Sequence, residues 1–198
     1  MKRKLLLLIL CVCLGKTAIA QKDSLAFDDR GKYIYYKVVN VANNNADALF
    51  GKALVFFKSA FDKNTLKLAS QDSKAASLTG EGYFLVSKKL SMAKHDDGKI
   101  TCKVTIEIKD SKYRYWLTDF VFTPYQRDRY NNMVPQLGLD VDMEKANKQY
   151  DKADVEHYLD ECGAFSKRVG KKLEQFMVEA PKAKKDTVAK KVISINKW

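Results

Sequence analysis

Few residues of this chain are suited to metal binding or nucleophilic catalysis: it has two histidines and four cysteines. His95 stands before Asp96 and Asp97 in the stretch "HDDGK", so three side chains able to ligate a metal lie together. A solvated polar turn is the simpler interpretation. His157 lies off the apolar stripe of its predicted helix, and no serine or cysteine has a recognisable base partner. We therefore expect no catalytic residue, metal or cofactor.

Two of the cysteines, Cys102 and Cys162, lie in the predicted domain, and both are expected to face inward. Cys102 falls on the helix-facing side of its predicted strand, and Cys162 falls on the sheet-facing stripe of the last helix. We therefore expect the two side chains to touch. A disulfide between them and a pair of buried thiols remain alternatives.

The N-terminal segment 1–20 has the pattern of a signal peptide. A basic "MKRK" precedes the apolar run "LLLLILCVCLG", which is too short to span a bilayer. Ala18 and Ala20 then occupy the small-residue positions of a cleavage site, which predicts Gln21 as the mature start. Cys11 and Cys13 lack the preceding small residue of a lipobox. We expect a periplasmic or extracellular protein that is not a lipoprotein.

The stretch "KITCKVTIEIKDSKYRYWLTDF" (99–120) predicts two strands joined by a turn at Asp110-Ser111. Alternation from this turn places one mostly apolar face toward the helices and leaves aromatic residues on the other. The predicted contact surface for a ligand or partner consists of four residues of the second strand: Arg114, Trp116, Phe120 and Phe122. Asp119 falls on the inward face in this register. The alternative is that another part of the chain covers these aromatics.

A second candidate contact region is the stretch "YQRDRY" (125–130), in which Arg127 and Arg129 alternate with aromatic residues. We expect it in a long connection over 123–150, where a solvated connector is the alternative to a functional loop. Residues 181–198 predict a basic flexible tail, for which weak contact with an anionic surface and a merely solubilising role are alternatives.

The elements that must position these residues alternate between strand and helix patterns. Strands are predicted over 33–41, 65–72 and 77–90, with Gly80 and Gly82 as a bulge or bend and Asp97-Gly98 as a two-residue turn. Helical periodicity covers 46–61 and 151–180. This order predicts one α+β domain over 21–180: a single curved antiparallel sheet with two helices on one face.

The formal net charge of +12 is concentrated at the two ends of the chain. Residues 1–20 carry four basic side chains, and residues 181–198 carry six lysines against one aspartate, which leaves +3 for residues 21–180. A nucleic-acid-binding protein needs a basic stripe on a structured face, so we expect no nucleic-acid partner.

Three segments resemble a known family: "ALFGKALVFFKSAF", "SLTGEGYFLV" and above all "VTIEIKDSKYRYWLTDF". The family consists of exported Bacteroidetes proteins of unknown function with a fold like that of the TATA-binding protein (TBP). The resemblance covers roughly residues 33–123. Its hairpin motif is matched by Lys109, Asp110, Tyr113, Arg114, Tyr115, Thr118, Asp119 and Phe120, whereas Ser111 and Lys112 depart from it. It implies a fold and export, and it supplies no catalytic residues.

These observations favour a non-enzymatic binding or interaction module of the cell envelope, which contacts an unknown protein or envelope ligand through the open sheet face. Two alternatives stay open: an envelope hydrolase that uses carboxylates, and a structural component of an envelope assembly. The sequence determines neither the partner nor the oligomeric state.

Overall fold

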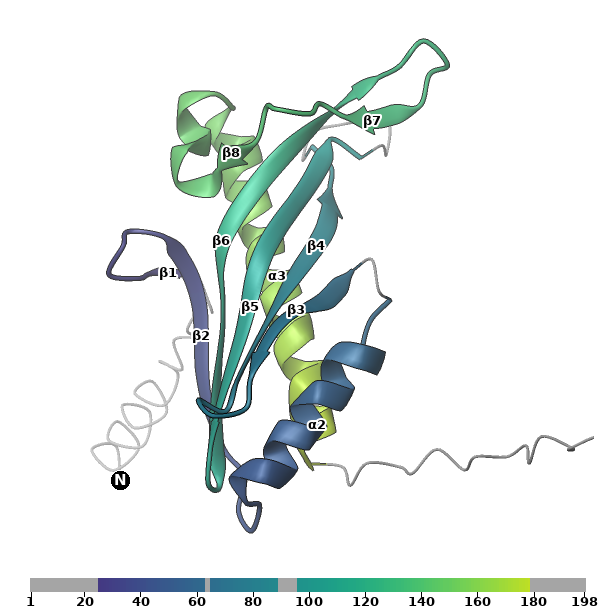
Figure 1. Ribbon diagram of the computed structural model, residues 1–198. Coiled ribbons are helices and arrows are strands. Elements are labelled where there is room, and N and C mark those ends of the chain that lie inside the picture. Colours follow the sequence, from purple (N-terminus) through teal and green to yellow (C-terminus); the bar gives the residue numbers. More distant parts are fainter. Residues whose placement is uncertain (1–24, 63–64, 89–95, 179–198) are drawn as a thin grey trace, which may run out of the picture.

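Within the part that the computed structural model describes, residues 25–62, 65–88 and 96–178, eight strands form one antiparallel sheet (Figure 1). The order across the sheet is β1-β2-β6-β5-β4-β3, and β7 and β8 also pair with β6. The expected α+β class with one antiparallel sheet is confirmed. The strands are β1 (Ala26–Phe27), β2 (Tyr33–Asn40), β3 (Leu66–Asp72), β4 (Ser77–Val86), β5 (Gly98–Lys109), β6 (Lys112–Arg127), β7 (Met133–Pro135) and β8 (Val141–Asp142).

Two α-helices, α2 (Ala46–Ser59) and α3 (Lys152–Val178), cover one face of this sheet, and a 3-10 helix, η1 (Met143–Lys148), precedes α3 (Figure 1). The Asn45 side chain caps α2 by accepting a hydrogen bond of 2.8 Å from the Ala48 N–H. Both α-helices lie where the apolar periodicity predicts them. No helix in the described ranges combines the length and the apolar character needed to cross a membrane.

The hydrophobic core lies between the sheet and these two helices. Alternate residues of β5 and β6 point into it, and the helices contribute residues three and four positions apart. The fully buried side chains include Leu49, Ala53 and Phe56 of α2, Val104 and Ile106 of β5, and Val155, Cys162 and Val169 of α3. This burial accounts for one face of the sheet and leaves the other face uncovered by helix.

The two glycines of β4 serve the approach of the helices. The bulge predicted near Gly80 is present in the pairing with β3, where the register shifts between Leu68, the partner of Gly80, and Ser70. The register between β4 and β5 is continuous from Ser77 to Val86. A Cβ on Gly80 would lie 2.3 Å from the Phe57 ring, and one on Gly82 would lie 3.3 Å from the Phe165 ring. Both glycines therefore leave room for phenylalanines of α2 and α3.

The β5–β6 hairpin keeps the predicted register only as far as Lys103, which pairs with Thr118. Beyond it the register shifts by one residue, and Thr101 pairs with Val121. Two residues of β6, Asp119 and Phe120, therefore oppose Cys102 alone, which is a β-bulge. Asp119 adopts φ 54°, the left-handed region that non-glycine residues rarely enter.

This bulge corrects three of the expected positions, because a shift of one residue exchanges the two faces of a strand. Phe120 and Phe122 were expected on the open face, yet both are 0% exposed in the core. Phe122 stacks on Tyr158 of α3 at 4.8 Å between ring centroids. Asp119 was expected to face inward, and it instead forms ion pairs on the open face with Arg30 and Lys103.

Two predicted turns and connections also differ from the structure. Gly98 is the first residue of β5 and pairs with Val86, so Asp97-Gly98 is not a two-residue turn. The connection between β4 and β5 spans 87–97, and His95 within it lies outside the described residues. The long connection expected over 123–150 is largely structured, because β6 continues to Arg127 and is followed by β7, β8 and η1. The segments 1–20 and 181–198 lie outside the described residues.

Cys102 and Cys162 are two free buried thiols in this structure, rather than a disulfide. They lie within electrostatic range of each other: burial raises the pKa of the Cys162 thiol, and a charge on Cys102 would raise it further. Burial also raises the pKa of Cys102 to about 12. Both thiols therefore stay protonated and inert at neutral pH.

The thiols yield a first prediction on reactivity. At pH 8, iodoacetamide should leave Cys102 and Cys162 of the folded protein unmodified, because the thiolate that reacts is suppressed and enclosed. The same reagent in denaturant should label both, as mass mapping of the peptides would record. Failure to label both thiols in denaturant without reductant would indicate a disulfide instead.

The glycines of the two helices yield a second prediction. A Cβ on Gly170 of α3 would lie 2.0 Å from the Tyr115 hydroxyl, whereas a Cβ on Gly51 of α2 would meet nothing within 4 Å. Gly170→Ala should cost about 2 kcal/mol in the free energy of unfolding, because Tyr115 is buried and cannot yield. Gly51→Ala should stabilise by up to about 1 kcal/mol through helix propensity. Denaturant unfolding of both variants measures this difference, and equal effects would contradict it.

The bulge yields a third prediction. Asp119→Gly should keep the free energy of unfolding within about 1 kcal/mol of the original, since glycine relieves the positive φ while the exposed ion pairs contribute little. Asp119→Val should lose about 2 kcal/mol or more, because a β-branched residue is strained there. Equal free energies of unfolding for the two variants, measured by denaturant unfolding, would show that the positive φ at position 119 does not limit stability.

Candidate functional site

The candidate site lies on the sheet face opposite α2 and α3. Strand register arranges its side chains in rows that cross the strands, because directly opposed residues point to the same side. One row is charged: Glu81 of β4 opposes Lys103 of β5, and Asp119, from the bulge of β6, joins this row through its ion pair with Lys103. The next row contains Thr79, Thr105, Trp116 and Tyr36. We call this surface the open face.

In the charged row, acidic and basic groups alternate from β3 to the β1–β2 turn. Lys67 lies 3.1 Å from Glu81, and Lys103 lies 3.4 Å from Asp119. Arg30 of the turn approaches Asp119 at 3.4 Å. The charges therefore offset one another along the row, and it offers both donors and acceptors to a ligand.

The neighbouring row carries the aromatic part of the open face. Trp116 is half-buried, and the Arg114 guanidinium lies over its ring at 5.5 Å from the centroid. Arg114 also donates a hydrogen bond of 2.7 Å from Nε to Glu107. Tyr36, paired with Trp116 in the register, is 51% exposed. This row therefore presents large, partly apolar side chains between charged groups.

Two hollows meet on the open face at Lys103 and Asp119. The first, of about 600 Å³, lies beneath the β1–β2 turn and is lined by Arg30, Tyr36, Arg114 and Trp116 among others. The second, of about 710 Å³, extends toward β3 and β4 and is lined by Lys67, Glu81, Tyr83, Lys99 and Tyr125 among others. We call the first hollow the groove. Asp119, brought outward by the bulge, lies where the two hollows join.

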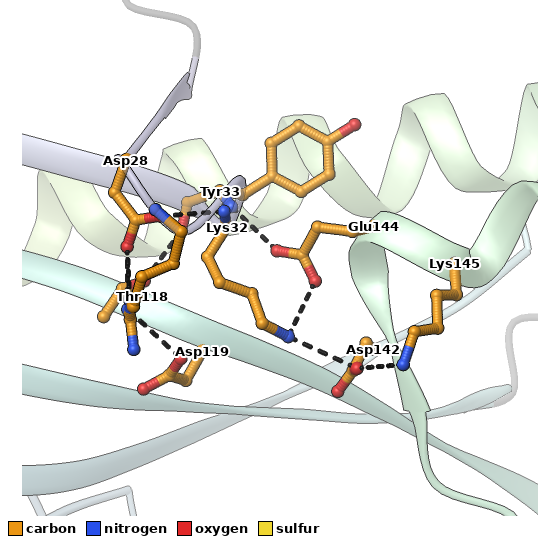
Figure 2. A network of polar contacts seen from close by, with 9 residues as sticks. Asp28, Lys32, Tyr33, Thr118, Asp119, Asp142, Glu144 and Lys145 are labelled. Carbon is orange, nitrogen blue, oxygen red and sulfur yellow. Dashed lines mark hydrogen bonds and ion pairs between the residues drawn. The ribbon is translucent and has the colours of Figure 1, made fainter.

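A polar network holds the β1–β2 turn in place above β6 (Figure 2). Asp28 accepts hydrogen bonds of 2.8 Å from the Lys32 N–H and of 2.7 Å from Arg30 Nη2. Arg30 also donates to the Thr118 hydroxyl at 3.3 Å, and that hydroxyl donates to the Tyr33 carbonyl at 3.1 Å. One wall of the groove is thereby fixed to the residue that precedes the bulge.

The same network continues to β8 and η1. Lys32 Nζ lies 3.3 Å from both Asp142 and Glu144, and the Tyr33 N–H donates to Glu144 at 2.7 Å (Figure 2). A hydrogen bond from Lys145 lowers the pKa of Asp142, against the effect of burial and with help from Lys32. The turn is therefore anchored on two sides of its base.

The Asp28 carboxyl group of the β1–β2 turn is not suited to act as a general acid. Burial raises the pKa of Asp28, but hydrogen bonds from the backbone of Lys32 and the side chain and backbone of Arg30 outweigh it, so the pKa is lowered overall. A general acid needs a raised pKa. Among the described residues, no group of three or more histidine, cysteine, aspartate or glutamate side chains is placed to hold a metal ion.

Of the predicted contact residues, the structure brings Arg114 and Trp116 together in the groove. Phe120 and Phe122 are in the core instead. Arg127 and Arg129 lie apart from both, at the far end of β6 and in the turn that follows it: Arg127 donates to Asn131, and Arg129 lies over the Tyr130 ring at 5.3 Å.

Sequence reasoning missed the contribution of the β1–β2 turn and of Asp119 to the groove. The polar stretch "DDRGK" (28–32) is a visible turn signal, and Gly31 has φ 72° as such a turn requires. Nothing local indicates that Arg30 reaches β6, because that contact joins residues 89 positions apart in the chain.

Comparison with known proteins gives a family and a fold. Residues 35–123 match the family described as "Domain of unknown function (DUF4468) with TBP-like fold". A TBP-like protein from Parabacteroides distasonis is similar in structure, with a TM-score of 0.59 and 14% identity over 79% of this chain and 98% of that one. A DUF4468 family protein from Bacteroides ovatus has a TM-score of 0.57 and 13% identity over 81% of this chain and 93% of that one.

No match was found among curated proteins. At these identities the solved structures establish the fold alone, and a fold does not fix a function. They agree with the resemblance expected from the hairpin motif. Residues 35–123 of this chain therefore match the DUF4468 family of domains of unknown function with a TBP-like fold.

Proposed function

We propose that this protein is an exported, non-enzymatic binding module that contacts a partner through the groove on its open face. The observation that carries the proposal is the conformation of Asp119. Its positive φ costs about 1–3 kcal/mol, and this strain places a carboxylate at the junction of two hollows. Strained residues of this kind cluster at functional sites, and bulges re-aim side chains there.

The chemistry of the groove supports binding. Asp119 is 28% exposed, and its two ion pairs, both at 3.4 Å, are long enough for a ligand to exchange with them. Trp116 and Tyr36 add aromatic surface beside these charges. Trp, Tyr and Arg are the residues that most often dominate the free energy of protein association.

Export and location in the envelope are part of the proposal. They rest on the basic, apolar and small-residue pattern of residues 1–20. A partner in the periplasm or outside the cell is consistent with it. The arginines of the β6–β7 ribbon, Arg127 and Arg129, remain a second candidate contact, which the experiment below separates from the groove.

The test is capture of a partner from an envelope extract by the purified protein. Trp116→Ala and Asp119→Asn should each weaken capture by about tenfold or more, the size of effect expected at the centre of an interface. Tyr130→Ala, at the 73% exposed tip of the β6–β7 ribbon, should leave capture unchanged. Asp119→Asn should also leave the melting temperature nearly unchanged, since asparagine tolerates positive φ.

Undiminished capture by both groove variants would refute the groove as the contact surface. Loss in Tyr130→Ala alone would assign binding to the ribbon. Turnover of an envelope substrate that Asp119→Asn abolishes would favour the alternative, a carboxylate hydrolase.

A further inference from the structure

The outer edge of β2 is open along most of its length. β6 covers one side of the strand, and β1 pairs with only Tyr33 and Ile34 on the other. Val41, which follows β2, continues the β2–β6 register, and its N–H donates to the Ser111 carbonyl at 2.8 Å. Hydrogen-bonded pairs alternate along an antiparallel ladder, so the odd-numbered residues of β2 exchange hydrogen bonds with β6.

It follows that the N–H and C=O groups of Tyr36, Val38 and Asn40 point away from the sheet. In residues 25–62, 65–88 and 96–178, no backbone group pairs with these outward groups. Such an edge is a template for another strand.

The two edges of the sheet differ in how they are protected. β3, at the opposite edge, has a register shift between Leu68 and Ser70, a bulge that discourages pairing. β2 runs against β6 without such a shift. Its one lysine, Lys37, extends to Glu174 of α3 at 2.7 Å, on the helix side, so it does not guard the open face.

The side chains along this edge are apolar and exposed. Tyr36 is 51% and Val38 50% exposed, and both lie on the open face beside Trp116 and Arg114. A hollow of about 270 Å³ adjoins them. A strand laid along β2 would place alternate side chains over this surface.

The charge of the residues that line this hollow indicates which side chain of an added strand would fit there. Its lining includes three cations, Lys109, Lys112 and Arg114, against one carboxylate, Glu107. Arg114 already binds Glu107 at 2.7 Å, which leaves the two lysines to attract an anion. An acidic side chain of the added strand fits this balance.

We propose that β2 accepts an extended segment of a partner protein as an added strand, with an apolar side chain on Tyr36 and Val38 and an acidic one near Lys109 and Lys112. A polypeptide is the ligand that offers donors and acceptors at the spacing of the open ladder. The inference rests on the proposed function, because the added side chains lie on the same open face as the groove.

The experiment pans displayed random peptides of about ten residues, enough for a typical strand, on the full chain. Val38→Pro removes an outward N–H without removing a bond to β6, so the fold should tolerate it. Val38→Thr keeps that N–H and is the matched control. Selected peptides should alternate apolar residues, contain an acidic one and bind Val38→Pro at least about fivefold more weakly, the factor for one lost hydrogen bond.

Hydrogen exchange supplies a readout that does not depend on the proline variant. The Val38 amide should exchange rapidly in the free protein and slow down when a selected peptide binds. Equal peptide binding by Val38→Pro and the original protein would overturn the proposal. A Val38 amide already protected without peptide would also overturn it, because the edge would then be covered in the free protein.

The envelope-extract assay separates this proposal from the function on which it rests. Capture that Trp116→Ala loses and Val38→Pro retains would leave the groove as a binding site and refute the added strand. Capture that both variants retain would refute the proposed function as well.

Discussion

The β-bulge that opposes Asp119 and Phe120 to Cys102 is the constraint on which the rest of this structure depends. In a strand of 16 residues that alternated without interruption, the even-numbered side chains would all lie on one face and the odd-numbered side chains on the other. The bulge exchanges the faces part-way along β6. It lets the first half present Trp116 on the open face, while the second half buries Phe120 and Phe122 in the core, where Phe122 contacts the rings of Tyr150 and Tyr158.

The magnitudes explain why the chain tolerates this bulge. A non-glycine residue at positive φ costs about 1–3 kcal/mol. Burial of each phenylalanine contributes about 1.5–3 kcal/mol, so the two together equal or exceed that cost. The strain at Asp119 is therefore compatible with a stable core, and the same bulge turns the Asp119 carboxylate outward.

The open face owes its character to cross-strand pairing of charge. On this face Lys67 pairs with Glu81, Lys103 with Asp119 and Arg114 with Glu107, so opposite charges offset one another across the strands. The TBP-like fold by itself does not fix which ligand this face binds, because a fold does not fix a function. A surface of paired charges and aromatic rings suits a partner that is itself mixed in polarity.

The sequence alone determined the fold class and the positions of the two α-helices and the longer strands, because apolar periodicity is local. No knowledge of distant residues was needed for the 3.6-residue stripes of α2 and α3 or for the Asp110-Ser111 turn, and the inward face of β5 followed from alternation. Only the tertiary structure decided the site. Nothing in "YWLTDFVF" shows where alternation breaks, because Asp119 turns outward in response to Phe122 meeting Tyr158 and to Arg30 arriving from a turn 89 residues earlier. Local pattern carries no information on such contacts, which the folded chain alone brings together.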